Sequence, residues 1–240
     1  ATASAAAQPI DTRSPTVTIS DNAPGTASAN VTYSLTFSET VSGLAADDFT
    51  VSNGSIVSVS GSGSNYSVVV APAANTEGTL GLSLKAGAVQ DGAGNANATA
   101  SAAAQPIDTR SPTVTGFTPA DEAQGVGIGS NIVVTFSEPI QRGAGNVVLR
   151  IADDVVVATY DAATSADMNV TDNPLNINPG IDLAYATAYK VEFAQGSIKD
   201  IAGNPYTGTT SYNFTTVAAP IPGQTLTGTP GPDTLNGGAG

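Results

Sequence analysis

The feature that most constrains the fold is a duplication inside the chain. The sequence ATASAAAQPIDTRSPTVT occupies residues 1–18 and recurs unchanged at residues 98–115. The stretches that follow the two copies differ, so the duplicated stretch is not a domain by itself. A repeat with a period of about 100 residues matches the usual size of one compact domain. The duplication therefore predicts two successive modules, with a module boundary inside the repeated stretch.

Both modules show the alternation of apolar and polar residues that is typical of half-buried strands. In the first module, NVTYSLTFS places Val31, Tyr33, Leu35 and Phe37 on one face, and NYSVVVA and GTLGLSL continue the pattern. In the second module, NIVVTFS, NVVLRIA, VVVATY, AYKVEFA and TSYNFTT do the same. No helical period is evident in the first module, although the irregular segment 161–183 leaves room for a helical turn in the second.

Short strands separated by Gly-, Asn- and Asp-rich turns predict an all-β chain of two tandem immunoglobulin-like β-sandwich domains in an elongated arrangement. We place the first domain at residues 11–105, a linker at 106–112 and the second domain at 113–217. Residues 1–10 then correspond to the closing strand and linker of a preceding repeat. For residues 1–8 we expect disorder or pairing with a neighbouring molecule.

Charge and composition exclude several classes of function. The net charge of −13 opposes binding to nucleic acids and to anionic membrane surfaces, both of which require basic residues. No stretch approaches the roughly 18 apolar residues of a membrane span, so we expect no membrane insertion. The absence of His and Cys removes most zinc sites and most His-dependent catalysis.

The same acidic constellation occurs once in each module. Each module has an IDTRSP segment, an FSE tripeptide at the end of an early strand, and a D-x-A-G-N loop before its last strand. In chain order, the polar residues are Asp11, Glu39, Asp91 and Asn95 in the first module, and Asp108, Glu138, Asp200 and Asn204 in the second.

Immunoglobulin topology places these three segments at one pole of a sandwich, so each set is expected to converge. Gathered carboxylates repel one another unless a cation is present, and Ca²⁺ prefers six to eight oxygen ligands. We therefore predict one Ca²⁺ site per module, with Asp108 at the junction between them. The alternative is that the loops serve only as tight turns, since Asp-Gly and Gly-Asn tolerate positive φ. Weaker candidates for further ligands are Asp47, Asp48, Asp121 and Glu122.

No residue pair supports an enzyme. Glycosidase carboxylates face each other across about 5–10 Å, whereas neighbours on a strand, as in Asp47–Asp48 and Asp153–Asp154, point to opposite faces. We therefore expect no catalytic site and no catalytic residues.

Two resemblances to known families become evident from these motifs. FSETVSGLAADDFTVSNGSIVSVSG together with AGAVQDGAGN resembles a bacterial Ig-like repeat over residues 11–105. FTPADEAQGVGIGSNIVVTFSEPI, with YKVEFAQGSIKDIAGN and YNFTT, is similar to a second bacterial Ig-like family over residues 112–216.

The end of the chain, residues 218–240, reads as a linker followed by the truncated start of an RTX nonapeptide repeat. Gly228, Gly231, Asp233 and Leu235 match that repeat, with Thr229 in place of a glycine. A calcium-binding β-roll needs stacked units, so we expect this remnant to be disordered and free of metal.

Ig-like modules followed by RTX repeats resemble the end of large bacterial adhesins exported by type I secretion. This resemblance implies extracellular or cell-surface spacer modules, stiffened by Ca²⁺ at domain poles and junctions. Their partners would be neighbouring Ig-like and RTX modules of the same chain, with host or surface ligands bound by other domains. The alternatives are an accessory region of a type I-secreted RTX enzyme and a module that binds glycans or proteins directly. Glycan binding usually requires exposed aromatics, and four tyrosines are candidates: Tyr160, Tyr185, Tyr206 and Tyr212.

Overall fold

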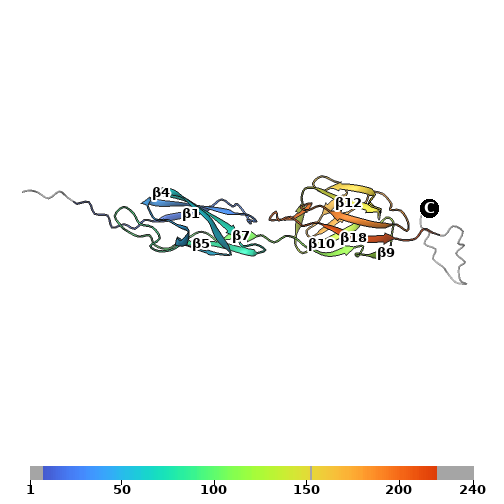
Figure 1. Ribbon diagram of the computed structural model, residues 1–240, viewed down its shortest axis with the longest axis horizontal. Helices are drawn as coiled ribbons and strands as arrows, with labels where there is room; N and C mark the ends of the chain where they lie inside the picture. Colours follow the sequence, from blue (N-terminus) through green and yellow to red (C-terminus); the bar gives the residue numbers. More distant parts are fainter. Residues whose placement is uncertain (1–7, 152, 221–240) are drawn as a thin grey trace, which may run out of the picture.

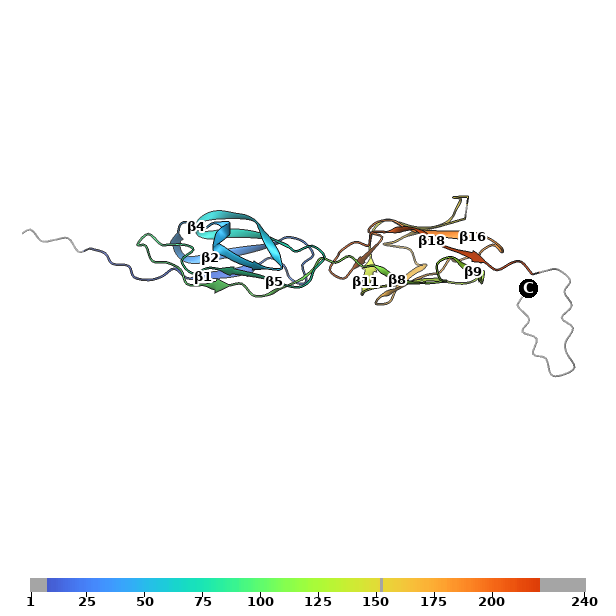
Figure 2. The same cartoon turned by 60° about the horizontal axis from the view of Figure 1, so that its bottom comes forward.

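The computed structural model describes residues 8–151 and 153–220, which form two β-sandwich domains. Domain 1 contains strands β1–β7 and domain 2 contains strands β8–β18. The two domains lie end to end along the long axis of the molecule in both views (Figures 1 and 2). The prediction of an all-β, tandem and elongated architecture is confirmed.

Domain 1 consists of two sheets packed over one apolar core. The first sheet has the order β1 (Val17–Asp21), β2 (Val31–Val41) and β4 (Gly54–Pro72). The second contains β3 (Phe49–Ser52), β5 (Glu77–Leu84), β6 (Ala100–Ser101) and β7 (Gln105–Asp108). The predicted inward face of β2 is buried from Val31 to Phe37, because alternate side chains of a strand point to the same side.

Strand β4 is longer than the alternating pattern NYSVVVA at residues 65–71 indicates. The chain instead continues through the turn-like sequence GSGSN as one strand. Gly61 and Gly63 have φ angles of 117° and 66°, and a Cβ on Gly61 would lie 2.3 Å from the carbonyl oxygen of Asn65. Glycine therefore lets the strand bend at this point without ending.

Domain 2 combines two main sheets with a short pair of antiparallel strands that are far apart in the sequence. One sheet has the order β14 (Met168–Val170), β15 (Pro174–Ile177), β10 (Ile132–Phe136) and β8 (Val114–Thr118). The other has the order β13 (Val156–Asp161), β12 (Asn146–Ile151), β16 (Ala188–Phe193), β18 (Thr209–Thr216) and β9 (Ala123–Val126). The pair consists of β11 (Ile140–Arg142) and β17 (Ile198–Asp200).

Helical structure in the described residues is limited to single turns. The segment 161–183 contains the strands β14 and β15, with Met168, Leu175 and Ile177 buried, and a turn in which the N–H of Ser165 donates to the carbonyl of Asp161 at 2.9 Å, the i to i+4 bond of a single helical turn. Domain 1 contains a single turn of 3₁₀ helix, η1 (Ala46–Asp48), which apolar periodicity cannot reveal in so short a segment. Over residues 8–151 and 153–220, no helix has both the length and the apolar character needed to cross a bilayer.

Three of the four tyrosines expected at the surface are buried: Tyr160, Tyr206 and Tyr212. Tyr212 is 1% exposed, stacks on Phe117 with 4.0 Å between ring centroids, and donates a hydrogen bond to the carbonyl of Pro119. Tyr160 in β13 and Tyr212 in β18 lie on the inward face of their strands, which cannot be known before the register is known. Tyr206 is buried in the loop between β17 and β18. Of the four, Tyr185 is exposed at 42%.

The segment expected to be a linker begins inside domain 1. Residues 105–108 form β7, which pairs with β5, and Ile107 lies in the core with 1% of its surface exposed. The connection between the domains is therefore shorter than 106–112. Thr109 follows the strand and still hydrogen-bonds to domain 1, through Thr76 and Ala73.

Candidate metal centres

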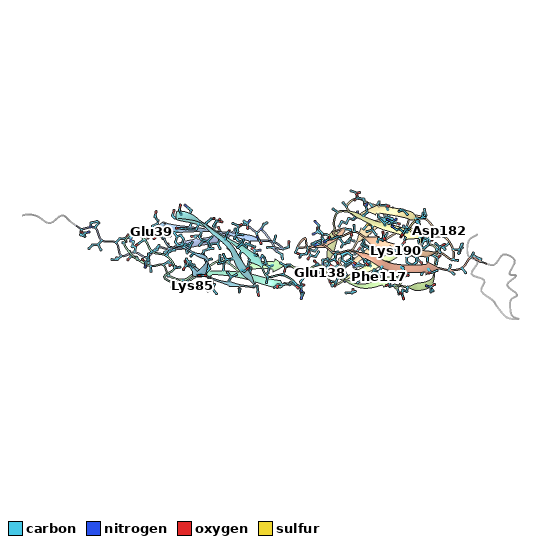
Figure 3. All side chains as sticks on the ribbon, in the orientation of Figure 1. Glu39, Lys85, Phe117, Glu138, Asp182 and Lys190 are labelled. Atoms are coloured by element: carbon cyan, nitrogen blue, oxygen red, sulfur yellow. The ribbon has the colours of Figure 1, made fainter. Side chains whose placement is uncertain are left out.

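The first acidic cluster lies at the outer pole of domain 1, the end that faces away from domain 2. It contains Asp11 before β1, Glu39 in β2 and Asp91 in the loop after β5. Each residue offers a carboxylate oxygen, and these oxygens all lie within 4.8 Å of one another. Glu39 is labelled at this outer pole in Figure 3. Three residues that are far apart in the sequence are therefore brought together as predicted.

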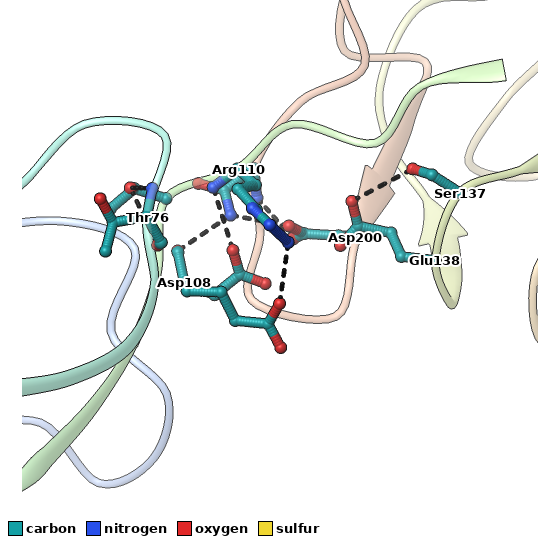
Figure 4. A network of polar contacts seen from close by, with 9 residues as sticks. Thr76, Asp108, Arg110, Ser137, Glu138 and Asp200 are labelled. Atoms are coloured by element: carbon teal, nitrogen blue, oxygen red, sulfur yellow. Dashed lines mark hydrogen bonds and ion pairs between the residues drawn. The ribbon is translucent and has the colours of Figure 1, made fainter.

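The second cluster lies where domain 2 meets domain 1. Asp108 ends β7, Glu138 follows β10, and Asp200 ends β17; their carboxylate oxygens also lie within 4.8 Å of one another. Figure 4 shows these residues together at the junction, with Ser137 beside Glu138. All six carboxylates of the two predicted acidic sets thus belong to one cluster or the other.

The D-x-A-G-N loops hold the aspartates by local hydrogen bonds. One carboxylate oxygen of Asp91 accepts the backbone N–H groups of Ala93 and Asn95, both at 2.8 Å. Gly94 has a φ of 91°, a conformation that favours glycine and allows the loop to close on the aspartate. The same motif at Asp200 places the Asn204 N–H 2.7 Å from its carboxylate.

The two asparagines orient the clusters. The side-chain Nδ2 of Asn95 donates to the carboxylate of Asp91 at 2.8 Å and to the backbone carbonyl of Asp11 at 3.2 Å. The Nδ2 of Asn204 donates likewise to Asp200 at 2.7 Å and to the carbonyl of Asp108 at 3.0 Å. Both partners are acceptors, so the nitrogen of each amide faces them. The amide nitrogen is a donor and cannot be a ligand to a cation. A ligand role for either asparagine would therefore need its amide oxygen, and it stays a prediction.

Electrostatic strain is concentrated on the glutamate of each cluster. Burial raises the pKa of Glu39, and the neighbouring charges of Asp91 and Asp11 raise it further. In contrast, hydrogen bonds from Asn95, with its side-chain amide first, lower the pKa of Asp91. The charged form of Asp91 is thus favoured, while the charged form of Glu39 beside it is disfavoured. A bound cation would relieve the repulsion between the two carboxylates.

The junction cluster has the same electrostatic character and one additional acid. Burial raises the pKa of Glu138, followed by the charges of Asp200, Asp108 and Glu77, while a hydrogen bond from Ser137 opposes the rise. Glu77 belongs to domain 1, so the field at Glu138 comes from both domains.

The residues present fit a hard divalent cation. With Ca²⁺–oxygen distances of 2.3–2.6 Å, two oxygens on one ion lie at most about 5 Å apart, and both clusters meet this limit. Every ligand atom within the two clusters is a carboxylate oxygen, the type that Ca²⁺ prefers over nitrogen or sulfur.

Asp108 connects the two domains through both its backbone and its side chain. Its N–H donates to the carbonyl of Ala27 at 3.0 Å, and β7 pairs it with Glu77, so its backbone is part of domain 1. Its carbonyl accepts Asn204 and its carboxylate joins Glu138, both of domain 2.

Sequence reasoning missed the contacts that domain 1 makes around this cluster. The Ser28 hydroxyl donates to the carbonyl of Ala202 at 2.8 Å across the junction. Arg110 pairs with Glu77 at 3.0 Å, but both side chains are exposed, so the pair contributes little stability. Glu77, Arg110, Ile201 and Ala202 line an open cleft beside the cluster. No motif marks Ser28 or Glu77, because their role depends on the neighbouring domain.

The weaker ligand candidates lie outside both clusters. Asp48 accepts the N–H of Ala45 in the η1 turn, and Asp121 accepts the N–H of Asn213 in domain 2. Neither these residues nor Asp47 and Glu122 belong to a group of three close acids among residues 8–151 and 153–220.

Comparisons with known proteins agree with the two-domain architecture. Two different family models, both described as bacterial Ig-like domain, match residues 11–106 and residues 108–216. No match was found among curated proteins.

Solved structures that resemble the chain include two from Yersinia pseudotuberculosis. The adhesin InvE is 17% identical with a TM-score of 0.29, and the match covers 84% of this chain and 58% of that one. InvD is 16% identical with a TM-score of 0.29, and the match covers 89% of this chain and 60% of that one. The chain therefore spans less than two thirds of the length of either structure.

Proposed function

Because the chain belongs to the bacterial Ig-like families, with two tandem domains, we propose that it is a spacer segment of a large bacterial surface protein of the adhesin type. The proposed role is structural. The segment holds neighbouring modules of the same chain at a fixed distance from one another and in a fixed relative orientation, outside the cell. No catalytic role is assigned to any residue. Residues 228–238, which resemble the start of an RTX repeat, lie outside the described residues. Their resemblance adds export by type I secretion to the proposal.

Calcium would stiffen this spacer at the junction. The observation that carries the proposal is the position of Asp108, whose backbone is hydrogen-bonded within domain 1 while its carboxylate meets Glu138 and Asp200 of domain 2. Bound Ca²⁺ supplies the positive charge that these carboxylates need in order to remain together. Asn204 orients Asp200 and fastens the Asp108 carbonyl, so the same loop positions the ligand and the incoming chain.

The experiment measures interdomain flexibility and stability with calcium and with chelator. Spin labels can be attached to one introduced cysteine in each domain, since the chain has no Cys of its own. Calcium is expected to narrow the distance distribution between the labels. It should also stabilise the protein by about 2.7 kcal/mol when free calcium is about 100 times Kd.

Two matched variants separate the junction from the outer pole. Asp108→Asn should leave the distribution broad in calcium, whereas Asp11→Asn, the same change in the outer cluster, should leave it narrow. If chelator changes neither the distances nor the melting temperature, the calcium proposal is wrong.

A further inference from the structure

The sequence QPIDTR occurs at residues 8–13 and 105–110, and the two copies lie in different surroundings. In the second copy, Gln105 and Ile107 belong to β7 and are buried in domain 1. In the first copy, Gln8 is exposed and Ile10 is exposed at 85%. The first copy therefore carries a core side chain that packs against nothing in the described part of domain 1.

From the aspartate onward, the two copies make the same contacts. Arg13 and Arg110 each donate a backbone N–H to the preceding aspartate at 3.0 Å. Each asparagine donates to the carbonyl of that aspartate, at 3.2 Å in the outer pole and 3.0 Å at the junction. Just before each following strand, one backbone N–H donates to a serine hydroxyl. Thr16 donates to Ser38 at 3.0 Å, and Thr113 donates to Ser137 at 3.1 Å. The outer pole and the junction thus hold the chain that enters them by the same set of hydrogen bonds.

The outer pole also has the counterparts of the residues that domain 2 offers to domain 1. Domain 1 donates from Ser28 to the carbonyl of Ala202, which corresponds to Ala93 in the D-x-A-G-N loop of the outer pole. Domain 1 presents Glu77 to Arg110, which corresponds to Arg13. One position differs, because Ile201 is exposed at 67% and its counterpart is Gly92, which is smaller and cannot block an approaching domain.

We propose that the outer pole of domain 1, with residues 8–11, is a docking surface for a second copy of domain 1 placed directly before it in the chain. Residues 8–11 supply the last strand of that preceding domain, with Ile10 in its core. Its Ser28 and Glu77 then contact Ala93 and Arg13. This inference rests on the proposed spacer function and specifies its homotypic partner.

A chain with domain 1 duplicated tests this surface directly. Residues 1–108 followed by residues 12–240 give three domains and reproduce the natural duplicated sequence at the new junction. One pair of spin labels, at Ser60→Cys in both copies of domain 1, spans the new junction. A second pair, at Ser60→Cys of the second copy and Thr159→Cys, spans the natural junction; both residues are exposed.

In calcium, the new junction is expected to give a distance distribution as narrow as the natural one. Asn95→Ala in the second copy should broaden only the new junction, and Asn204→Ala only the natural one. A broad distribution at the new junction beside a narrow natural one overturns this inference alone, whereas broad distributions at both overturn the spacer function as well. An equally narrow distribution when residues 113–217 are placed before residue 8 overturns the choice of domain 1 as partner.

Discussion

Truncating the same isoleucine in the two copies of QPID should have very different effects. Ile107 is 1% exposed and packs in the core of domain 1 beside β5, whereas Ile10 is exposed at 85%. Ile107→Ala removes three buried carbon atoms, which corresponds to about 2.4 kcal/mol at about 0.8 kcal/mol for each. The cavity left behind adds to this value, and Ile-to-Ala changes in cores cost about 2–5 kcal/mol.

The control is the identical substitution in the identical local sequence. Ile10→Ala removes the same atoms from a position surrounded by solvent, so we expect a change below about 0.5 kcal/mol. Because helix or strand propensity, neighbouring residues and unfolded-state effects are closely matched, the difference between the variants isolates burial.

Thermal unfolding followed by NMR signals of each domain is the appropriate assay, because it separates domain 1 from domain 2. At about 3 kcal/mol and about 4–8 °C for each kcal/mol, Ile107→Ala should lower the melting temperature of domain 1 by about 12–24 °C. The signals of domain 2 should keep their midpoint in both variants. Equal destabilisation of domain 1 by the two substitutions would refute the assignment of β7 to its core.

Three further predictions concern domain stability. Tyr212→Phe should destabilise domain 2 by about 1 kcal/mol, because it removes a hydrogen bond to a backbone carbonyl. Tyr33→Phe in domain 1 should be neutral or stabilising, since this buried hydroxyl has no hydrogen-bond partner among the described residues; thermal unfolding of the pair measures the difference. Lys190 and then Arg150 hold the pKa of Glu192 below its usual 4.5, so this group stabilises domain 2 above that pH and its contribution is lost as the pH falls further. Urea midpoints between pH 7 and pH 3 should fall less for Glu192→Gln than for the parent; parallel curves would contradict the assignment.

Local sequence was sufficient for most strands and for the clustered acids. Val31, Tyr33, Leu35 and Phe37 are buried because a strand repeats every two residues, and that period is visible without tertiary information. The six carboxylates could be selected because one sandwich topology brings the ends of the same strands together in both domains. Their recurrence in two modules provided the signal.

Other features depend on contacts between distant residues. Nothing near Tyr212 in the sequence shows that Phe117 will stack on it, and a glycine-rich segment such as 61–65 reads as a turn although β4 continues through it. The contacts of Ser28 and Glu77 at the junction likewise follow from the placement of the neighbouring domain.

The duplicated stretch separates the two kinds of information. The sequence by itself determined the strands, the module period and the set of acids that meet at each pole, because periodicity and topology are properties of the chain. Only the tertiary structure decided that Ile107 is buried while Ile10 is exposed, and that Ser28 and Glu77 make contacts at the junction. The physical reason is that burial and electrostatic fields depend on which groups surround a residue in space, and identical local sequences carry no record of those surroundings.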